Sequence, residues 1–539
     1  MLVYGDHSER TDVRDWLERL TGKLAAIALM RPGIDRHAAL VGALIEAGQL
    51  LQGIADAGLP AAEEFNAFAY ELALAVVRSW DSRFVRTGPL PTVPRLEWDA
   101  EVELRIPEGF AFYSVYPEAY AEAARRLTLL GPPRVIGIRS IGTSLGAIIA
   151  AALGAPPPIT VRPFGDPFAR EVVLPGEVEQ AAHYVIVDEG PGLSGSSFGA
   201  VADRLESHGV PRERIAFVPS HGGDLGPHAS NAHRTRWRVA QRVPAEFDPS
   251  FLRERFGRLE PFSTGSRGER LKFLSHVNGE RVLIKFAGLG EIGARKLEMA
   301  RALHAAGFTP APLEIVHGFL IERWCEAAQP LSVDDRPVEE IGRYIGARAR
   351  MFPAGRESGA SIDELIRMAR RNIGLALGEK TAPALDGWNA KDLARPVARV
   401  RTDNKLDRCE WLRGADGRLI KTDALDHHRG HDLIGCQDAA WDVAGAVIEF
   451  DLMHGESERL AAASGLSIDP QLLEFYCVAY CSFRLGQAHL AGMEHQAGHY
   501  AAALRDLLHL CVHPATRHES LIGRRAERTA SGTIRRAFG

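Results

Sequence analysis

Cysteine and lysine are both scarce in this chain of 539 residues. All six cysteines lie beyond residue 324, and no two are separated by two residues, the spacing of many zinc and redox motifs. This pattern excludes a disulfide-stapled secreted module and predicts free thiols in a reducing cytoplasm. Only 8 of the 64 basic side chains are lysines, so each lysine is a candidate for a specific role.

The sequence also lacks a hydrophobic run of about 18 residues that is free of charges and helix breakers. Its first residues are acidic and polar rather than basic and apolar. We therefore expect no membrane span, no signal peptide and a cytoplasmic location. A net charge of −5 gives no indication of a nucleic-acid-coating protein, and the 46% hydrophobic content is that of a globular chain.

Changes of pattern along the chain predict four regions. Residues 1–86 are predicted to be helical, with an amphipathic stripe between residues 63 and 80. Residues 95–245 alternate short apolar runs with loops and helices, which is typical of a parallel α/β sheet. Residues 260–515 begin with a hairpin at Asn278-Gly279 and become mostly helical, and residues 518–539 form a basic tail that we expect to be disordered.

The most specific motif covers residues 185–197. An apolar strand delivers Asp188 and Glu189 to its carboxyl end, and a loop of Gly, Ser and Pro then opens a helix. Backbone N–H groups at such a helix start form an anion site, and Gly192 and Gly195 allow a phosphate to approach closely. The two acids suit sugar hydroxyls or a divalent cation. A ribose 5-phosphate combines the two groups, since it carries a phosphate at one end and sugar hydroxyls beside it.

This stretch resembles the signature of the type I phosphoribosyltransferases, with Glu189 in place of a frequent Asp and with an unusual Pro191-Gly192. The resemblance implies Mg²⁺ and the substrate 5-phosphoribosyl 1-pyrophosphate (PRPP). It implies catalytic roles for Asp188, Glu189 and Arg139, the last in a pyrophosphate loop. The implied PRPP-binding residues are Ser140, Gly142, Thr143, Gly192, Leu193, Ser194, Gly195 and Ser196.

Two further segments are candidates for this site. Arg162 and Arg170 lie between the two loops and either complete the phosphate site or are ordinary surface arginines. The aromatic segment 107–117 either forms a hood over the acceptor or packs in the core.

The second half contains a lysine at the end of an apolar strand, Lys285, followed thirteen residues later by Glu298 in a predicted helix. A strand lysine paired with a helix glutamate orients ATP phosphates in kinases. Residues 319–324 are a candidate hinge strand. Farther on, a predicted hairpin ends at Asp423, and Asp438 and Asp442 follow it.

These motifs resemble the aminoglycoside phosphotransferase and choline kinase-like families. The resemblance implies that Asp423 binds Mg²⁺, that ATP is a possible cofactor and that Asp438 and Asp442 brace the catalytic loop. The loop itself departs from the family, because counting back from Asp423 puts Lys405 in place of the base and Glu410 in place of the asparagine.

Two alternatives for this loop stay open. Either Asp403 serves as the base from a shifted position, or this half of the chain binds a nucleotide without transferring phosphate. The cluster between residues 426 and 432, with His427 and His431 four apart, is either a transition-metal site or a polar loop.

The sequence thus predicts an α/β chain. A helical segment precedes a parallel-sheet phosphoribosyltransferase-like domain, and an α+β bilobal kinase-like domain follows. The predicted function is Mg-dependent transfer of phosphoribose from PRPP to a small acceptor, with possible phosphorylation of a small molecule by the second domain. The alternatives are a non-catalytic PRPP sensor, a small-molecule kinase with a scaffold front half, and an interaction protein. The sequence does not indicate the oligomeric state.

Overall fold

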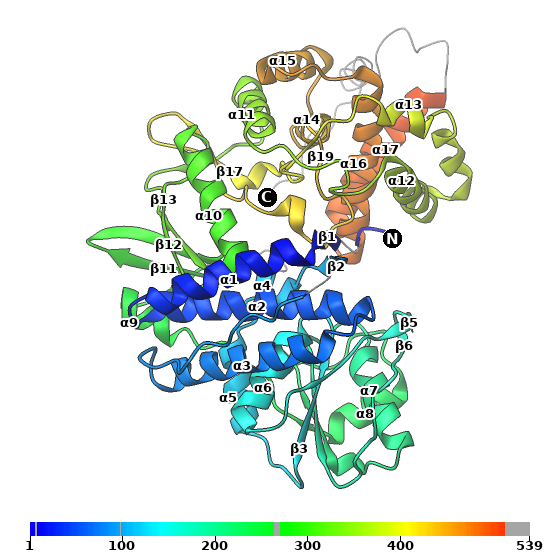
Figure 1. Ribbon diagram of the computed structural model, residues 1–539. Coiled ribbons are helices and arrows are strands. Elements are labelled where there is room, and N and C mark those ends of the chain that lie inside the picture. The colour runs from blue at the N-terminus through cyan, green and yellow to red at the C-terminus, as the bar shows by residue number, and fades with distance from the viewer. Residues whose placement is uncertain (6–7, 97–98, 264–269, 513–539) are drawn as a thin grey trace. The chain divides into compact units, whose positions relative to one another are not determined.

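The computed structural model describes residues 1–5, 8–96, 99–263 and 270–512 (Figure 1). The basic tail predicted at residues 518–539 lies outside these residues. Contacts divide the chain into two compact units, which are described separately. The front unit comprises Ser8–Leu297 and Leu313–Glu322, and the back unit comprises Met1–His7, Glu298–Pro312 and the chain from Arg323 onward. The predicted domain boundaries at residues 95–245 and 260–515 stay predictions.

Three long helices open the front unit: α1 (Val13–Leu29), α2 (Ile34–Asp56) and α3 (Ala62–Asp81). The apolar stripe predicted on the third helix is confirmed, since Phe65, Phe68, Leu72 and Val76 are all buried. Helix α2 is long and apolar enough to cross a membrane by length and composition alone. However, 78% of its most apolar window is buried inside the fold, where α2 packs along α3 (Figure 1).

A five-stranded parallel sheet follows, in the order β4-β3-β7-β8-β9. Its strands are β3 (Pro133–Ile138), β4 (Ile159–Val161), β7 (His183–Val187), β8 (Ile215–Val218) and β9 (Gln241–Arg242). Helix α6 (Gly142–Leu153) follows β3, and α7 (Ser196–Ser207) follows β7. The predicted succession of strands, loops and helices is therefore confirmed. Both faces of the sheet are buried: Val185 and Val187 join one hydrophobic cluster, and Tyr184 and Ile186 join another.

The second sheet of the front unit is five-stranded, in the order β10-β11-β12-β14-β13. Its strands are β10 (Glu260–Pro261), β11 (Lys272–Val277), β12 (Glu280–Phe286), β13 (Pro312–Val316) and β14 (Phe319–Arg323). The hairpin predicted at Asn278-Gly279 is confirmed, and both residues have the positive φ of a tight turn, 51° and 83°. Phe286 and Phe319 belong to the same hydrophobic cluster as the opening helices, so this sheet and those helices share one core.

Shorter elements complete the front unit. They are β1 (Ser8–Asp12), β2 (Glu101–Arg105), α4 (Glu108–Phe112), α5 (Pro117–Arg125), β5 (Phe164–Asp166), β6 (Ala169–Glu171), α8 (Asn231–Val239) and α9 (Ser250–Phe256). The pairing of β1 with β2 is absent from the predictions, because β1 is polar and its partner lies about ninety residues away.

Helix α10 (Gly290–Ala305) contains the division between the units, and the back unit is mainly helical beyond it. Its helices are α11 (Val338–Met351), α12 (Ile362–Leu377), α13 (Ala390–Ala394), α14 (Ala440–Glu449), α15 (His454–Ser464), α16 (Pro470–Leu490) and α17 (Glu494–Val512). Its strands are β15 (Gln329–Pro330), β16 (Arg399–Val400), β17 (Trp411–Arg413), β18 (Leu419–Lys421) and β19 (Gln437–Asp438). Trp441 is fully buried and contacts the rings of Tyr476 and Tyr480, which fastens α14 to α16.

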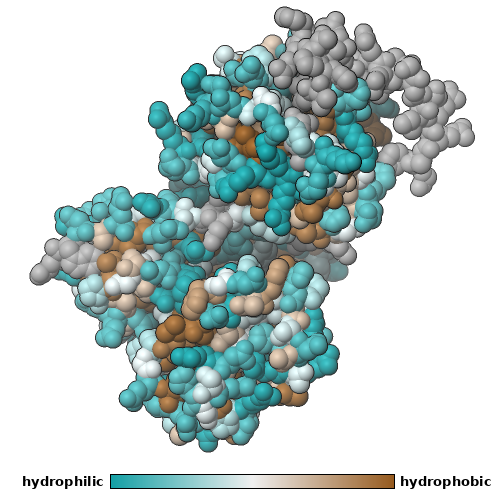
Figure 2. All heavy atoms as spheres, turned by 90° about the vertical axis from the view of Figure 1, so that its right-hand side faces the viewer, coloured by the Kyte–Doolittle hydropathy of each residue, from teal (hydrophilic) through white to brown (hydrophobic). Residues whose placement is uncertain are grey.

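The visible face in Figure 2 is mostly hydrophilic, with separate hydrophobic patches. Among the exposed apolar side chains are Phe164, Phe168 and Leu193, and Phe168 stacks on His228 at 4.3 Å between ring centroids. Leu193 lies in the glycine-rich turn described next, and the N–H of His228 donates to its carbonyl oxygen.

Candidate functional sites

The acid pair lies at the carboxyl end of β7, as the sequence predicts. Asp188 accepts a hydrogen bond of 2.8 Å from the N–H of Glu189, and Glu189 accepts one of 2.9 Å from the N–H of Gly109. Gly109 belongs to the segment predicted as a hood, so this segment does lie beside the acids. Its aromatic residues Phe110 and Phe112 are buried, which favours the alternative that they pack in the core.

Burial raises the pKa of Asp188 to about 7. It also raises the pKa of Glu189 to about 8, with a further contribution from the neighbouring Asp188. Both residues keep some exposed surface, so neither is fully enclosed in the core. Two acids in this environment favour a ligand that brings a cation or hydroxyl donors.

These raised pKa values predict a pH dependence. Protons stay on the folded acids at pH values where the unfolded chain has lost them, so the pair's contribution to stability declines as the pH rises from about 4 to 8. Divalent-cation binding at the pair is expected to strengthen over the upper part of this range. Thermal melting at pH 6 and pH 8.5 with and without Mg²⁺ tests both statements. Identical profiles for the wild type and the Asp188→Asn, Glu189→Gln variant would contradict them.

The turn after the acids is open. Gly192 has a φ of 60°, and a Cβ placed there would meet no atom within 4 Å. Gly195, with a φ of 63°, precedes α7 and offers no side chain to cap it. The N–H of Ser196 bonds to the Ser194 hydroxyl, which leaves the next N–H groups of the first helical turn without a side-chain cap. This backbone suits an anion.

The serine and threonine hydroxyls, by contrast, form hydrogen bonds to other groups of the protein. Ser196 Oγ donates to Pro167 O at 2.8 Å, and Ser194 Oγ lies 3.0 Å from Ser196 Oγ. Thr143 Oγ1 lies 2.9 Å from Gly48 O and is buried where α6 meets α2. The protons of these hydroxyls already serve backbone carbonyls or each other, and the PRPP-binding roles of Thr143, Ser194 and Ser196 stay predictions. Leu193 contributes an exposed side chain at the turn.

Arg139 of the predicted pyrophosphate loop and Arg162, which lies beyond that loop, both contact an acid that the sequence analysis missed. Arg139 Nη1 lies 3.4 Å from Asp56 Oδ1, and Arg162 forms an ion pair with the same carboxylate. Arg162 also donates to Arg139 O at 2.9 Å. Asp56 ends α2, so the opening helices hold this loop in place. Gly142 permits α6 to start against the sheet, since a Cβ there would lie 3.0 Å from Val187 O.

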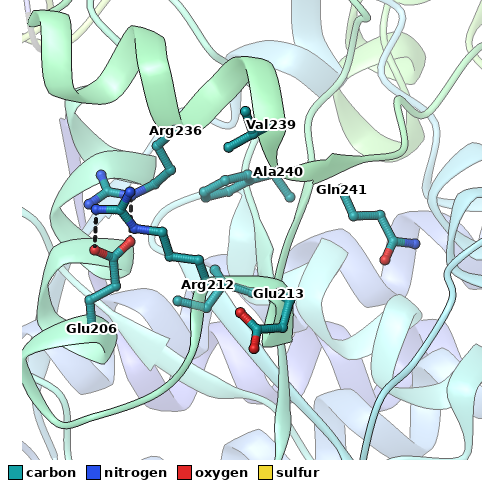
Figure 3. A pocket seen from close by; sticks show the side chains of 9 residues that line it. Glu206, Arg212, Glu213, Arg236, Val239, Ala240 and Gln241 are labelled. Carbon is teal, nitrogen blue, oxygen red and sulfur yellow. Dashed lines mark hydrogen bonds and ion pairs between the residues drawn. The ribbon is translucent and has the colours of Figure 1, made fainter.

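A cavity of about 230 Å³ lies elsewhere on the front unit, beside β8 and β9 (Figure 3). Glu206, Arg212, Arg236 and Gln241 are among the residues that line it. Glu206 Oε1 lies 2.8 Å from Arg236 Nε, and Glu206 Oε2 lies 3.1 Å from Arg212 Nη2. The charges of Glu206, Arg212 and Arg236 are thus paired with one another, and none of the predicted site residues lines the cavity.

The strand lysine of the kinase-like region has a neighbour on the same sheet. Lys285 Nζ on β12 lies 2.8 Å from Glu322 Oε2 on β14, and both side chains are largely buried. Glu298 is exposed on α10. The predicted pairing of Lys285 with Glu298 stays a prediction, because the two residues belong to different units.

In the back unit, Asp442 on α14 holds the predicted catalytic loop. Its two carboxylate oxygens accept the N–H groups of Asp403 and Asn404, at 2.8 and 2.9 Å. Asn404 has a φ of 64°, so the loop turns sharply where it is held. Burial raises the pKa of Asp442 to about 6. This contact agrees with the bracing role that the resemblance implies for Asp442, and the catalytic character of the loop stays a prediction.

Asp403 does not suit the role of a base. Its side chain is fully buried, accepts a hydrogen bond from the Tyr344 hydroxyl and lies 3.2 Å from His427 Nδ1. Burial opposes its charge, but Lys421 and His427 hold the pKa of Asp403 below its usual value. A carboxylate so enclosed is not accessible to a substrate hydroxyl, so we do not retain Asp403 as the base.

Lys405 and Glu410 form an ion pair, and Glu410 also binds Lys421. The second contact, from Lys421 Nζ to Glu410 Oε2, measures 2.6 Å, and Lys421 is completely buried. Burial opposes the charge on Lys405, but Glu410 and Asp407 raise the pKa of Lys405 above its usual value. Lys405 is therefore a cation and cannot accept a proton.

The Glu410→Gln substitution is expected to destabilise the back unit by about 3–5 kcal/mol, because it removes the charge that faces a buried lysine. Lys421 would retain only a longer contact to Asp403, at 3.6 Å, and a bond to a backbone carbonyl. Urea unfolding measures this change. The matched control is Glu340→Gln, which removes a partly exposed pair with Arg413 and should cost less than about 1 kcal/mol. Equal costs for the two variants would contradict the role given to Glu410.

Glu410, Asp423 and His427 together offer ligand atoms that all lie within 4.8 Å of one another. His427 Nε2 lies 3.5 Å from Asp423 Oδ2. Burial lowers the pKa of His427, but Asp423 and Asp403 outweigh this and raise it to about 10. A cation that binds here would therefore either displace the proton from His427 or be held by Glu410 and Asp423 without His427. His431, a metal ligand in only one of the two alternatives for this cluster, packs on Tyr4 at 4.9 Å between ring centroids.

No family model and no curated protein matches this chain. Solved structures of small-molecule kinases are similar to about half of it. The choline kinase LicA from Streptococcus pneumoniae is 15% identical, with a TM-score of 0.36, over 48% of this chain and 98% of that one. A choline/ethanolamine kinase family protein from Mesorhizobium loti is 17% identical, with a TM-score of 0.32, over 49% and 92%. A thermostable mutant of aminoglycoside phosphotransferase APH(4)-Ia is 17% identical, with a TM-score of 0.32, over 49% and 98%.

Proposed function

We propose that this chain is a small-molecule kinase, which uses ATP and a divalent cation to phosphorylate a hydroxyl group. The observation that carries the proposal is the cluster of Glu410, Asp423 and His427 beside a loop held by Asp442. The Asp423 side chain is 46% exposed, so the cluster can be reached from solvent. The front unit then serves as a scaffold or carries a separate site.

The two carboxylates fit a divalent cation such as Mg²⁺ by their chemistry, since this ion prefers oxygen ligands. Asp423 and Glu410 would hold the ion, which would neutralise charge on the phosphates when bound. Phosphoryl transfer depends mainly on positioning and electrostatic stabilisation, so a strong base is not essential. The acceptor oxygen bonds to the γ-phosphorus while the bond to the β–γ bridging oxygen breaks, and the hydroxyl proton leaves to water.

Lys405 takes a positioning role in this scheme. It stands where the family has its base and carries a positive charge fixed by Glu410. A cation at that place attracts the transferred phosphoryl group rather than the hydroxyl proton.

Incubation of the full chain with ATP labelled at the γ-phosphate, Mg²⁺ and fractionated small molecules from a cell extract tests the proposal. We expect label in a small organic product. Release of label only as inorganic phosphate, or no release at all, would reject small-molecule phosphorylation.

A second candidate function rests on the front unit. We propose that Asp188 and Glu189 bind the ribose of PRPP with Mg²⁺, and that the open turn at Gly192 receives the 5-phosphate. What favours this is the placement of a partly exposed acid pair next to an uncapped helix start. Arg139 and Arg162 would supply positive charge for the diphosphate, and Asp56 partly neutralises this charge.

The acceptor-dependent release of pyrophosphate from PRPP would support phosphoribosyl transfer. Tight PRPP binding without release across a panel of acceptors would favour a sensor, and no binding would leave the front unit as a scaffold. A cytoplasmic location and the absence of membrane and nucleic-acid partners remain predictions from the sequence.

A further inference from the structure

Three side chains outside both sites meet in the interior of the front unit. They are His37 on α2, Glu118 on α5 and His317 in the turn between β13 and β14. Their exposed fractions are 0%, 3% and 5%. His37 Nε2 and His317 Nε2 lie 2.6 and 2.7 Å from one oxygen of Glu118, Oε1. Their ligand atoms all lie within 4.8 Å of one another.

The second oxygen of this carboxylate, Glu118 Oε2, is in a different situation. Glu118 Oε2 is buried and has no hydrogen-bond partner among the described residues. A buried carboxylate oxygen without a partner is costly, because it has lost water and gained nothing in return. Both imidazoles lie against Glu118 Oε1, while Oε2 has no such contact. A cation between the three side chains could bind both carboxylate oxygens.

The surroundings support the imidazoles as ligands. His37 Nδ1 lies 2.9 Å from Ser79 Oγ, which can fix the ring with Nε2 toward Glu118. Tyr116 donates to His317 O at 2.8 Å, and His317 has a φ of 41°, a strained value for a residue with a side chain. Aromatic rings enclose the cluster: Trp80 and Phe84 contact His37, and Phe251 contacts His317.

We propose that His37, Glu118 and His317 bind one structural transition-metal ion, with Zn²⁺ as the best match. Two imidazole nitrogens and a carboxylate are ordinary zinc ligands, whereas Mg²⁺ and Ca²⁺ prefer oxygen ligands throughout. A bidentate Glu118 would complete four donor atoms. Because the cluster is enclosed, the ion is structural rather than catalytic, and it joins the opening helices to the turn of the second sheet.

Metal content of the full chain tests this proposal. Protein is produced in zinc-supplemented medium, dialysed against metal-free buffer and analysed by mass spectrometry for bound metals. We expect about one zinc ion per chain, as for a structural site with high affinity. The Asp423→Asn variant serves as the control, because it disables the other candidate cluster and should keep this zinc. The His317→Gln and Glu118→Gln variants should each lose at least nine-tenths of it.

Zinc-free wild type would overturn the proposal, and so would zinc that persists in both His317→Gln and Glu118→Gln. Because these variants involve buried residues and can fail to fold, cobalt provides a second measurement on the wild type. Protein produced with Co²⁺ in place of Zn²⁺ should show the intense visible absorption of a four-coordinate site, in the wild type and in Asp423→Asn. Its absence from the wild type would equally overturn the proposal.

Discussion

Replacing Asp423 by asparagine is expected to lower phosphoryl transfer by about a hundredfold or more, or about 2.7 kcal/mol of activation free energy. The substitution removes one of two carboxylates from the cluster of Glu410, Asp423 and His427. It leaves the loop contacts of Asp442 untouched, because these involve other residues. Initial rates of label transfer from ATP, or of slow ATP hydrolysis without an acceptor, measure the effect.

Asp416→Asn provides the matched control for this experiment. Asp416 lies in the turn before β18, where its half-exposed carboxylate binds the side chain of Arg418. The same chemical change at this position should leave the rate within about twofold, since surface pairs contribute little. If Asp423→Asn were as active as Asp416→Asn, the cluster would not be the metal site of a kinase.

The second large effect is expected in the front unit. The double variant Asp188→Asn, Glu189→Gln should weaken Mg-dependent PRPP binding at least about tenfold, or about 1.4 kcal/mol. Both carboxylates lose the charge that would hold the cation, and burial raises the pKa of each of them in the wild type. Because the folded acids tend to retain protons, this variant should not destabilise the fold near pH 6. Calorimetric titration of PRPP with and without Mg²⁺ measures the affinity.

The control for the double variant is Glu179→Gln with Asp203→Asn. Both of these carboxylates are about half exposed, and they form ion pairs with Arg134 and with the buried Arg236 respectively. PRPP affinity should be unchanged in this control. Loss of affinity in both variants, or in neither, would contradict the assignment of the acid pair.

The parallel sheet could be predicted from the sequence because its signals are local. Each strand is a short apolar run followed by a loop and a helix, as at residues 184–187, and both faces of the sheet are buried. The hairpin at Asn278-Gly279 is equally local, since the turn residues themselves specify it. The pairing of β1 with β2 is not local, and the polar sequence of β1 gives no sign of it.

The candidate sites were predicted less completely, for a related reason. Motif spacing places Asp188 at a strand end and Asp423 after a hairpin, and the loop contacts of Asp442 follow the family resemblance. Spacing does not reveal partners that come from distant parts of the chain. Asp56 reaches Arg139 from a helix that carried no motif.

The roles of single side chains were the least predictable feature. A hydroxyl in a glycine-rich loop can donate to a ligand or to the protein, and the sequence does not distinguish the two. Ser196 and Thr143 both donate to backbone carbonyls in this structure. In the same way, Asp403 has the right residue type for a base but is enclosed by Tyr344 and His427. The cluster at His37 was missed because its members lie far apart in the sequence.

Binding of ATP to the full-length wild type, titrated calorimetrically in the presence and absence of Mg²⁺, tests the central claim most directly. The kinase proposal predicts saturable binding that requires the divalent cation and is lost in Asp423→Asn but kept in Asp416→Asn. Failure of the wild type to bind ATP at any Mg²⁺ concentration would contradict it, as would binding that is indifferent both to Mg²⁺ and to the loss of Asp423.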